Sequence, residues 1–318
     1  MMSKIVAIQG NHPSTLNPKT DTTIFLAKEI QNKYKIFYYD PKNLSIIKSK
    51  IIANGFFIKF DYEEKNFFKI IKKQKLELKN CKFILIRQDP PFNIEYISTT
   101  YILDNIKDKV KIINDPTSIR NISEKLYSAK YQNFMPDTLF TQNIKEIKKF
   151  FKINKKIIIK PIHSFGGNDI YLLSKFNLRL IKKLIKKHSY IMCQKFLPKI
   201  NKGDKRVFII YGKIVGAISR VPKKGSFLSN LSKGGKAINI NLTSIEKKIS
   251  KKIAKDLKNK GIFFAGIDFI DQKLNGDINV TSPTGLKTLY DLSKVNLAKT
   301  FWIELKAWKT FQTNKKVH

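Results

Sequence analysis

The chain has 318 residues, of which 62 are basic and 24 acidic, and its formal net charge is +38 at pH 7. No apolar run approaches the ~20 residues that a membrane span needs, and the N-terminus MMSKIVAIQG lacks the apolar region of a signal peptide. We therefore expect no membrane association and a cytoplasmic location. Only five basic residues are arginines, and the lysines are scattered, so the charge predicts no specific nucleic-acid partner. Cys81, Cys193 and the four histidines have no spacing typical of a metal or redox site.

Strands and helices alternate through the first 115 residues. Strands are expected at 4–9, 35–40, 82–89 and 109–115, helices at 22–32, 62–74 and 94–107, and a hairpin at 51–60. This alternation predicts a doubly wound parallel sheet, which binds ligands at the carboxyl ends of its strands. Arg87 follows a buried strand directly, so its guanidinium is expected at that edge; the alternative is a turn in which Arg87 pairs with Asp89.

The central part begins with an expected helix at 118–132, which carries Lys125, followed by a strand at 137–141 and a helix at 143–153. Residues 156–173 then predict two strands joined by a loop with Gly166 and Gly167. Backbone N–H groups of such a loop can face phosphate oxygens, and Lys160 would reach the same phosphates. A strand at 189–200 breaks into a proline turn. This turn is expected either to pair with an adenine edge or to be part of a plain core strand.

The last third begins with a predicted hairpin at 205–220 that turns at Tyr211-Gly212. Arg206 and Arg220 lie near its open end, where both guanidinium groups could converge on one anion. Residues 222–235 predict a loop that covers a site or is disordered. A helix at 243–261, a strand at 262–270 and a final helix at 294–310 complete the expected elements.

The stretch from Gly266 to Gly285 places acidic and amide side chains at strand spacing. Asp277 and Asn279 are two residues apart and would share one face of a strand, with Asp268 on the preceding strand as a third oxygen ligand. Carboxylate and amide oxygens suit a phosphate-bound Mg²⁺. The alternative is a plain hairpin that turns at Asn275-Gly276, with solvated acids.

Nine motifs occur in one order between about residues 4 and 305: RQDPPF, NDPTSIRNISEKL, IIIKP with a GG loop, QKFLP, GDKRV, SRVP, NLSKGG, GIDFI and INVTSPT. This series resembles the bacterial glutathione synthetases, which are members of the ATP-grasp family. The resemblance implies an α/β fold, α+β in its C-terminal half. It also implies three parts: a substrate-side domain at 1–120, a central ATP-grasp lid at 121–200 and a catalytic ATP-grasp subdomain at 201–318.

The resemblance also implies roles for individual residues. It places ATP against Lys125, Lys160, Gly166, Gly167, Gln194, Lys195, Phe196, Leu197 and Asp204. It places Mg²⁺, or Mn²⁺ as an alternative ion, on Asp268, Asp277 and Asn279. It assigns catalysis to Arg206, Arg220 and Lys160. It assigns substrate contacts to Arg87, Asn230, Gly234, Gly235, Lys236, Ser282, Pro283 and Thr284, with residues 223–236 as a flexible cover.

The implied reaction is the ATP-dependent joining of γ-glutamylcysteine and glycine through an acyl phosphate, in an enzyme that is expected to be a homotetramer. The chain departs from the family pattern at Gln9–Pro13, at Leu228 and Lys236 in place of arginines, at Asp277 in place of glutamate, and at Gly285 in place of a bulkier residue. These departures keep open an ATP-grasp ligase with a different amino-acid or peptide substrate. A basic nucleic-acid-binding protein on the same scaffold is the third hypothesis.

Overall fold

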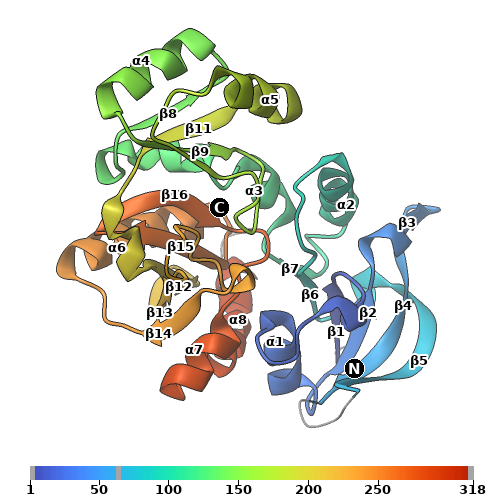
Figure 1. Ribbon diagram of the computed structural model, residues 1–318. Coiled ribbons are helices and arrows are strands. Elements are labelled where there is room, and N and C mark those ends of the chain that lie inside the picture. Colours follow the sequence, from blue (N-terminus) through green and yellow to red (C-terminus); the bar gives the residue numbers. More distant parts are fainter. Residues whose placement is uncertain (1–3, 62–65, 314–318) are drawn as a thin grey trace.

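The computed structural model describes residues 4–61 and 66–313 (Figure 1). Its strands form three sheets that follow one another along the chain, with seven, four and five strands. The second sheet lies at the top of Figure 1, above the third, and the first lies at the lower right. Within the described ranges, no helix is both long and apolar enough to cross a membrane.

The first sheet confirms the predicted parallel core. Strands β2, β1, β6 and β7 lie side by side and parallel, and the three remaining strands form an antiparallel extension on β2. The parallel strands are β1 (Ile5–Gln9), β2 (Lys35–Tyr39), β6 (Phe83–Ile86) and β7 (Lys111–Ile113), and the others are β3 (Leu44–Ile47), β4 (Lys50–Phe60) and β5 (Phe68–Glu77).

The antiparallel extension corrects two predictions. The expected hairpin at 51–60 is one continuous strand, β4, because Gly55 serves close packing and makes no turn: a Cβ there would lie 2.3 Å from the carbonyl oxygen of Tyr38. The expected helix at 62–74 is a strand from Phe68 onward, while residues 62–65 lie outside the described ranges. Most side chains of β5 are exposed on both faces, so its sequence has no alternation that would have indicated a strand.

Helices cover both faces of the first sheet. Val6 and Ile8 pack in a core with α1 (Thr22–Ile30) and α8 (Leu297–Thr313), whereas Ala7 faces the core formed with α2 (Ile94–Asp104) and α3 (Pro116–Asn121). The predicted N-cap of α1 is confirmed, because the carboxylate of Asp21 accepts a hydrogen bond from the backbone N–H of Ile24 (2.8 Å). The core on the α1 side continues into the third sheet through Phe208, Ile218 and Phe264.

The second sheet has the order β10-β9-β11-β8 and its own small core. Its strands are β8 (Thr138–Thr141), β9 (Ile157–Pro161), β10 (Tyr171–Leu173) and β11 (Ile191–Lys195), and its helices are α4 (Ile144–Asn154) and α5 (Leu178–His188). The four strands and α4 confirm the predicted elements, although β11 is shorter than the predicted strand at 189–200. The expected helix at 118–132 does not run through: α3 ends at Asn121, and a 3-10 helix follows at Leu126–Phe134. The break allows Glu124 to bond the third sheet, where its carbonyl oxygen accepts from the N–H of Ile278 (3.2 Å).

The third sheet is antiparallel, in the order β14-β13-β12-β15-β16. Its strands are β12 (Asp204–Ile210), β13 (Lys213–Val221), β14 (Lys236–Asn239), β15 (Phe264–Ile270) and β16 (Lys273–Asn279). The β12-β13 hairpin turns at Tyr211-Gly212 as predicted. The β15-β16 hairpin turns at Asp271-Gln272, where both residues have positive φ, so the alternative turn at Asn275-Gly276 is wrong.

Two further helices complete the C-terminal half. α6 (Ser244–Asn259) begins with a capping box between Thr243 and Glu246. α7 (Leu286–Ser293) was not expected, and the last helix, α8, begins at Leu297 and not at Lys294. Short 3-10 turns lie at Pro13–Thr15, Pro41–Asn43, Leu78–Asn80, Pro198–Lys202 and Leu231–Lys233.

Candidate active site

One cavity of about 720 Å³ lies where the three sheets meet. The loops after β1 and β6 contribute Asp21 and Asp89, the second sheet contributes Lys160 and the loop around Gly166, and the third sheet contributes Asp268. The position agrees with the expectation that ligands bind at the carboxyl ends of the parallel strands. Charged side chains from distant parts of the chain therefore face one space.

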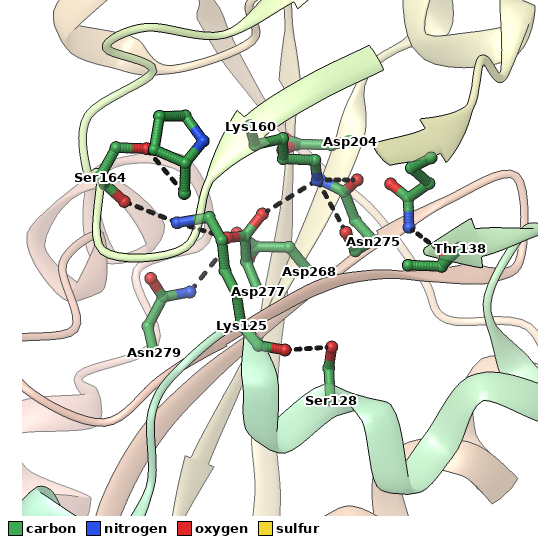
Figure 2. Close-up of polar contacts among 12 residues, drawn as sticks. Lys125, Ser128, Thr138, Lys160, Ser164, Asp204, Asp268, Asn275, Asp277 and Asn279 are labelled. Atoms are coloured by element: carbon green, nitrogen blue, oxygen red, sulfur yellow. Dashed lines mark hydrogen bonds and ion pairs between the residues drawn. The ribbon is translucent and has the colours of Figure 1, made fainter. Parts of the chain in front are cut away.

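Two buried lysines approach one carboxylate in this cavity (Figure 2). The Nζ of Lys125 lies 3.5 Å from Oδ1 of Asp277, and the Nζ of Lys160 lies 3.5 Å from Oδ2. Lys125 also donates to the carbonyl oxygen of Ser164 (2.6 Å), and Lys160 donates to both the carbonyl and side-chain oxygens of Asn275 (2.9 and 3.0 Å). Burial alone would raise the pKa of Asp277, but the charges of Lys160 and Lys125 outweigh it and hold that pKa below its usual range.

Two arginines and two aspartates form a second charged group, which we call the Arg–Asp ladder: Asp204, Arg206, Arg220 and Asp268. Arg206 donates to Asp268 through Nε (2.9 Å) and Nη2 (2.8 Å). Arg220 donates to Asp204 through Nε (2.7 Å) and Nη2 (2.5 Å), and its Nη2 also reaches Oδ2 of Asp268 (2.9 Å). The predicted convergence of both arginines on one anion is seen, and the anion is the carboxylate of Asp268.

Strand register explains the ladder. Asp204 lies opposite Arg220 across β12 and β13, and Arg206 lies opposite Asp268 across β12 and β15. Asp204 and Arg206 are two residues apart on β12, so their side chains share a face of the sheet. Burial raises the pKa of Asp268, but the two arginines outweigh it and hold that pKa far below its usual range. Burial likewise lowers the pKa of Arg220, and the two aspartates more than reverse this.

The expected metal ligands Asp268, Asp277 and Asn279 all line the cavity. The amide nitrogen of Asn279 faces the carbonyl oxygen of Gly266 (3.3 Å) and Oδ2 of Asp268 (3.5 Å). Two carboxylates and an amide on one wall fit a hard cation that keeps several waters and shares phosphate ligands. Among the described residues no cluster of three His, Cys, Asp or Glu could hold a metal ion, so a cation here would depend on Asn279 and on the nucleotide.

Two loops meet over the cavity. Gly166 and Gly167 have φ of 63° and 79°, and a Cβ on Gly167 would lie 2.9 Å from Oδ1 of Asn230. Lys233 donates to the side-chain oxygen of Asn168 (3.2 Å). The expected cover thus contacts the glycine loop. Its residues Gly234, Gly235 and Lys236 are not among those that line the cavity, and Lys236 begins β14.

The end of β11 forms another wall, with Gln194, Lys195, Phe196 and Leu197. The side chain of Gln194 donates to Oγ1 of Thr138 (3.1 Å), and the backbone N–H of Phe196 donates to the carbonyl oxygen of Lys156 (3.0 Å). These bonds hold the segment against the second sheet. Pairing of this segment with adenine stays a prediction.

On the substrate side, Ser282 and Thr284 line the cavity, whereas Arg87 and Pro283 lie behind its wall. Arg87 donates through Nε to Oγ1 of Thr23 (3.1 Å) and through Nη2 to the carbonyl oxygen of Pro283 (3.1 Å). Its hydrogen bonds therefore join α1 to the Ser-Pro-Thr turn, and they do not go to Asp89. A substrate contact of Arg87 stays a prediction.

Sequence reasoning missed three residues that shape the site. Oε1 of Glu124 accepts from the N–H groups of Val280 (2.9 Å) and Thr281 (3.1 Å), which fixes the segment after β16. Asn275 holds Lys160, as described above. The side chain of Asn114 donates to the carbonyl oxygens of Phe264 and Val280. Glu124 could have been suspected because it precedes Lys125, but the other two contacts depend on chain pairing that no local pattern reveals.

Comparison with known proteins agrees with this architecture. Residues 5–120 match the family described as prokaryotic glutathione synthetase, N-terminal domain, and residues 124–294 match the prokaryotic glutathione synthetase, ATP-grasp domain. The glutathione synthetase of Mesorhizobium japonicum is 35% identical over 303 residues, which cover 93% of this chain and 96% of the relative. That of Agrobacterium fabrum is 34% identical over 310 residues, which cover 95% and 96%.

Solved structures with low sequence identity share the fold. The D-alanyl-alanine synthetase A of Vibrio cholerae has a TM-score of 0.62 at 14% identity and covers 96% of this chain and 97% of its own. The D-cycloserine synthetase DcsG has a TM-score of 0.63 at 10% identity and covers 93% and 97%. The expected fold class is therefore confirmed, as is the resemblance drawn from the ordered motifs. The chain belongs to the prokaryotic glutathione synthetase family and is an ATP-dependent carbon–nitrogen ligase with the ATP-grasp fold.

Proposed function

We propose that this chain joins the cysteinyl carboxylate of γ-glutamylcysteine to the amine of glycine, with conversion of ATP to ADP and phosphate. The family match over both halves of the chain supports the reaction class. The observation that carries the proposal is the pair Lys125 and Lys160, which are both buried and both aimed into the cavity beside Asp277. Two fixed ammonium groups next to oxygen ligands are suited to the phosphates of a nucleotide.

The reaction would proceed in two displacements. In the first, a carboxylate oxygen attacks the γ-phosphorus and the bond to ADP breaks, which gives an acyl phosphate. In the second, the amine nitrogen attacks the acyl carbon and phosphate leaves, taking up the proton that the amine loses. No side-chain nucleophile is required, because positioning and charge stabilisation supply the catalysis.

The chain's own residues would share these tasks. Lys125 and Lys160 would hold the phosphates, and Arg206 and Arg220 would stabilise the negative charge of the transferred group. A divalent cation on Asp268, Asp277 and Asn279, either Mg²⁺ or Mn²⁺, would supply further charge neutralisation. The glycine loop and the cover at 223–236 meet over the cavity and would exclude water from the acyl phosphate.

Further expectations belong to the same proposal. Gln194–Leu197 would contact adenine, and Arg87, Asn230, Gly234, Gly235, Lys236, Ser282, Pro283 and Thr284 would serve the dipeptide side. The division into a substrate domain (1–120), a lid (121–200) and a catalytic subdomain (201–318) matches the order of the three sheets and is part of the proposal. A homotetramer and a cytoplasmic location remain predictions, and light scattering on the purified protein tests the first.

Release of ADP tests the reaction directly. Purified protein is assayed with Mg-ATP, γ-glutamylcysteine and glycine, and the product is identified by mass. Turnover should require all three substrates. Turnover only when another amino acid or peptide replaces one of the pair would refute this substrate assignment and leave the ligase class intact.

A ligase with a different substrate is the second candidate. Leu228 and Gly285 both line the cavity, where the family pattern has an arginine and a bulkier side chain. Leu228 leaves this part of the cavity less cationic than an arginine would, whereas a side chain at position 285 would face the ring of Phe208. A panel of amino acids as amine substrates, measured at equal concentrations, separates the two hypotheses by their kcat/KM values. Nucleic-acid binding at physiological salt without any ATP turnover would support the third hypothesis.

A further inference from the structure

We propose that Asp204 is a positioning residue that fixes the guanidinium of Arg220, and that it is not a direct ligand of the nucleotide as its motif implies. The inference rests on the proposed ligase reaction, in which Arg220 meets the transferred phosphate. It is carried by the hydrogen bonds of the Arg–Asp ladder, whose members all line the cavity.

Both carboxylate oxygens of Asp204 are already engaged. Oδ1 accepts from Nε of Arg220 at 2.7 Å and Oδ2 accepts from Nη2 at 2.5 Å, which is a bidentate pair between two residues directly opposite on neighbouring strands. Such a pair fixes the plane of the guanidinium as well as its position. Asp204 is 3% exposed and Arg220 is 5% exposed, so water offers little competition for these bonds.

The ladder is asymmetric, and the asymmetry gives Asp204 its role. Asp268 accepts two hydrogen bonds from Arg206 and one from Arg220, so one negative charge is shared between two positively charged arginines. Arg220 has a second carboxylate, that of Asp204, whereas the remaining side-chain contact of Arg206 is a 3.4 Å approach to Oγ1 of Thr284. If Asp268 turns toward a cation, Arg220 keeps its two bonds to Asp204. Asp204 would therefore keep the guanidinium of Arg220 in place for the transferred phosphate even without Asp268.

A nucleotide ligand would behave differently from a positioning residue. A carboxylate that accepts a hydrogen bond from the nucleotide contributes to nucleotide binding, so its loss weakens ADP affinity. A carboxylate that orients Arg220 supports the transfer step, so its loss lowers kcat and leaves ADP affinity unchanged. The two roles are therefore separated by measuring kcat and ADP affinity on the same variant.

The test uses Asp204→Asn in the full-length protein, with Asp271→Asn as the matched control. Asp271 is also ion-paired, to Lys199 at 2.7 Å, but it lies on the β15-β16 turn outside the cavity. We expect Asp204→Asn to lower kcat by about 10- to 100-fold, as misplacement of a catalytic group does. The dissociation constant for Mg-ADP, from calorimetry, should stay within about twofold of the wild-type value. Asp271→Asn should change neither, and Asp204→Glu should recover part of kcat.

A double-mutant cycle provides the second readout. If Asp204 acts through Arg220, then adding Asp204→Asn to Arg220→Lys should cost far less than Asp204→Asn costs alone. If the two substitutions lower kcat independently, so that the loss in the double variant equals the product of the two single losses, the proposal is wrong. A weakened Mg-ADP affinity with an unchanged kcat would also overturn it. Because ADP binding is measured without peptide or amine, this result holds even if γ-glutamylcysteine is not the substrate.

A measurement on the wild-type protein keeps the inference testable if Asp204→Asn does not fold. The chain has only five arginines, so its arginine Nε–H signals in ¹⁵N NMR spectra can be assigned by substitution. The Nε–H of Arg220 should be protected from exchange with water, and it should remain so after Mg-ADP is added. Loss of that protection on ADP binding would show that Asp204 leaves Arg220 for the nucleotide, and would contradict the proposal.

Discussion

Lys160 and Asp277 face each other in the cavity, with 3.5 Å between Nζ and Oδ2, and Asn275 holds the same ammonium group with two oxygens. Burial lowers the pKa of Lys160, and the charge of Asp277 opposes that shift. The ammonium group is thus placed before any phosphate arrives. This matters because a fixed charge stabilises a transition state without reorganisation during the reaction.

Replacing Lys160 by alanine should therefore abolish most turnover. Loss of one placed cation at the phosphates is expected to lower kcat/KM for ATP by about 100- to 1,000-fold. Lys199→Ala is the matched control, because Lys199 is 61% exposed in its side chain and pairs with Asp271 away from the cavity. ADP release measures both variants, and wild-type rates in Lys160→Ala would refute the phosphate assignment.

Asp268→Asn should abolish turnover and also destabilise the fold. Asp268 accepts three hydrogen bonds from two buried arginines. Removing one partner of a buried ion pair typically costs about 3–5 kcal/mol in the free energy of unfolding. Urea titration at pH 7 measures this loss.

The same variant has a defined pH dependence. The folded-state pKa of Asp268 is depressed, so its contribution is present above the pKa of the unfolded chain and is lost as pH falls through the folded value. The difference in stability between wild type and Asp268→Asn should be constant above about pH 5 and shrink below about pH 4. A constant difference down to pH 2 would contradict the depressed pKa.

Arg220→Lys tests whether the guanidinium fork is needed. An ammonium group cannot make the bidentate pair with Asp204 and also reach Asp268, so kcat should fall by about 100-fold. Arg179→Lys is the control, since Arg179 is exposed on α5. Steady-state kinetics of the two variants give the comparison. Equal rates would mean that a point charge suffices at position 220.

Gly167→Ala should weaken the contact between the loop that contains Gly166 and Gly167 and the cover at residues 223–236. Positive φ at this residue strains any side chain by about 1–2 kcal/mol, and the new Cβ would also crowd Asn230. Gly225→Ala is the control, because Gly225 has φ of 83° but no atom within 4 Å of the Cβ position. We expect KM for ATP to rise by about 3- to 10-fold in Gly167→Ala and much less in Gly225→Ala.

Tryptic cleavage in the cover provides a second readout for these variants. The lysines at which trypsin can cut in residues 223–236 are Lys223, Lys224, Lys233 and Lys236. In the presence of a non-hydrolysable ATP analogue, the cover should be cut faster in Gly167→Ala than in the control. Equal cleavage rates would show that the two loops close independently.

Motif order and strand spacing predicted much of the site. The two-residue step from Asp277 to Asn279 and the ends of the β12-β13 hairpin were enough to place these side chains in one region, because side chains alternate along a strand. The pairing of Arg220 with Asp204 could not be predicted, since it depends on the register between two strands. Arg87 lies behind the cavity wall for a similar reason: its partner, the carbonyl oxygen of Pro283, is 196 residues away in sequence.

Two of the errors in the fold lie in the antiparallel extension of the first sheet. Within residues 4–61 and 66–313, β5 pairs only with β4. It exposes most of its lysines, so neither face has a buried pattern. In β4, Gly55 marks the close approach of Tyr38, whereas glycine in a sequence most often indicates a turn. Both features depend on neighbouring strands, so the sequence of either segment alone does not predict them.

The core that continues from the first sheet into the third has a mechanical consequence. α8 and Phe264 pack with Ile8 in one hydrophobic core, and Asn114 ties β7 to the third sheet by bonds to Phe264 and Val280. The second sheet has a separate small core around Ile147. The first and third sheets therefore share one core and are coupled mechanically. The second sheet joins them through Met192 of β11, which packs in the core of the third sheet.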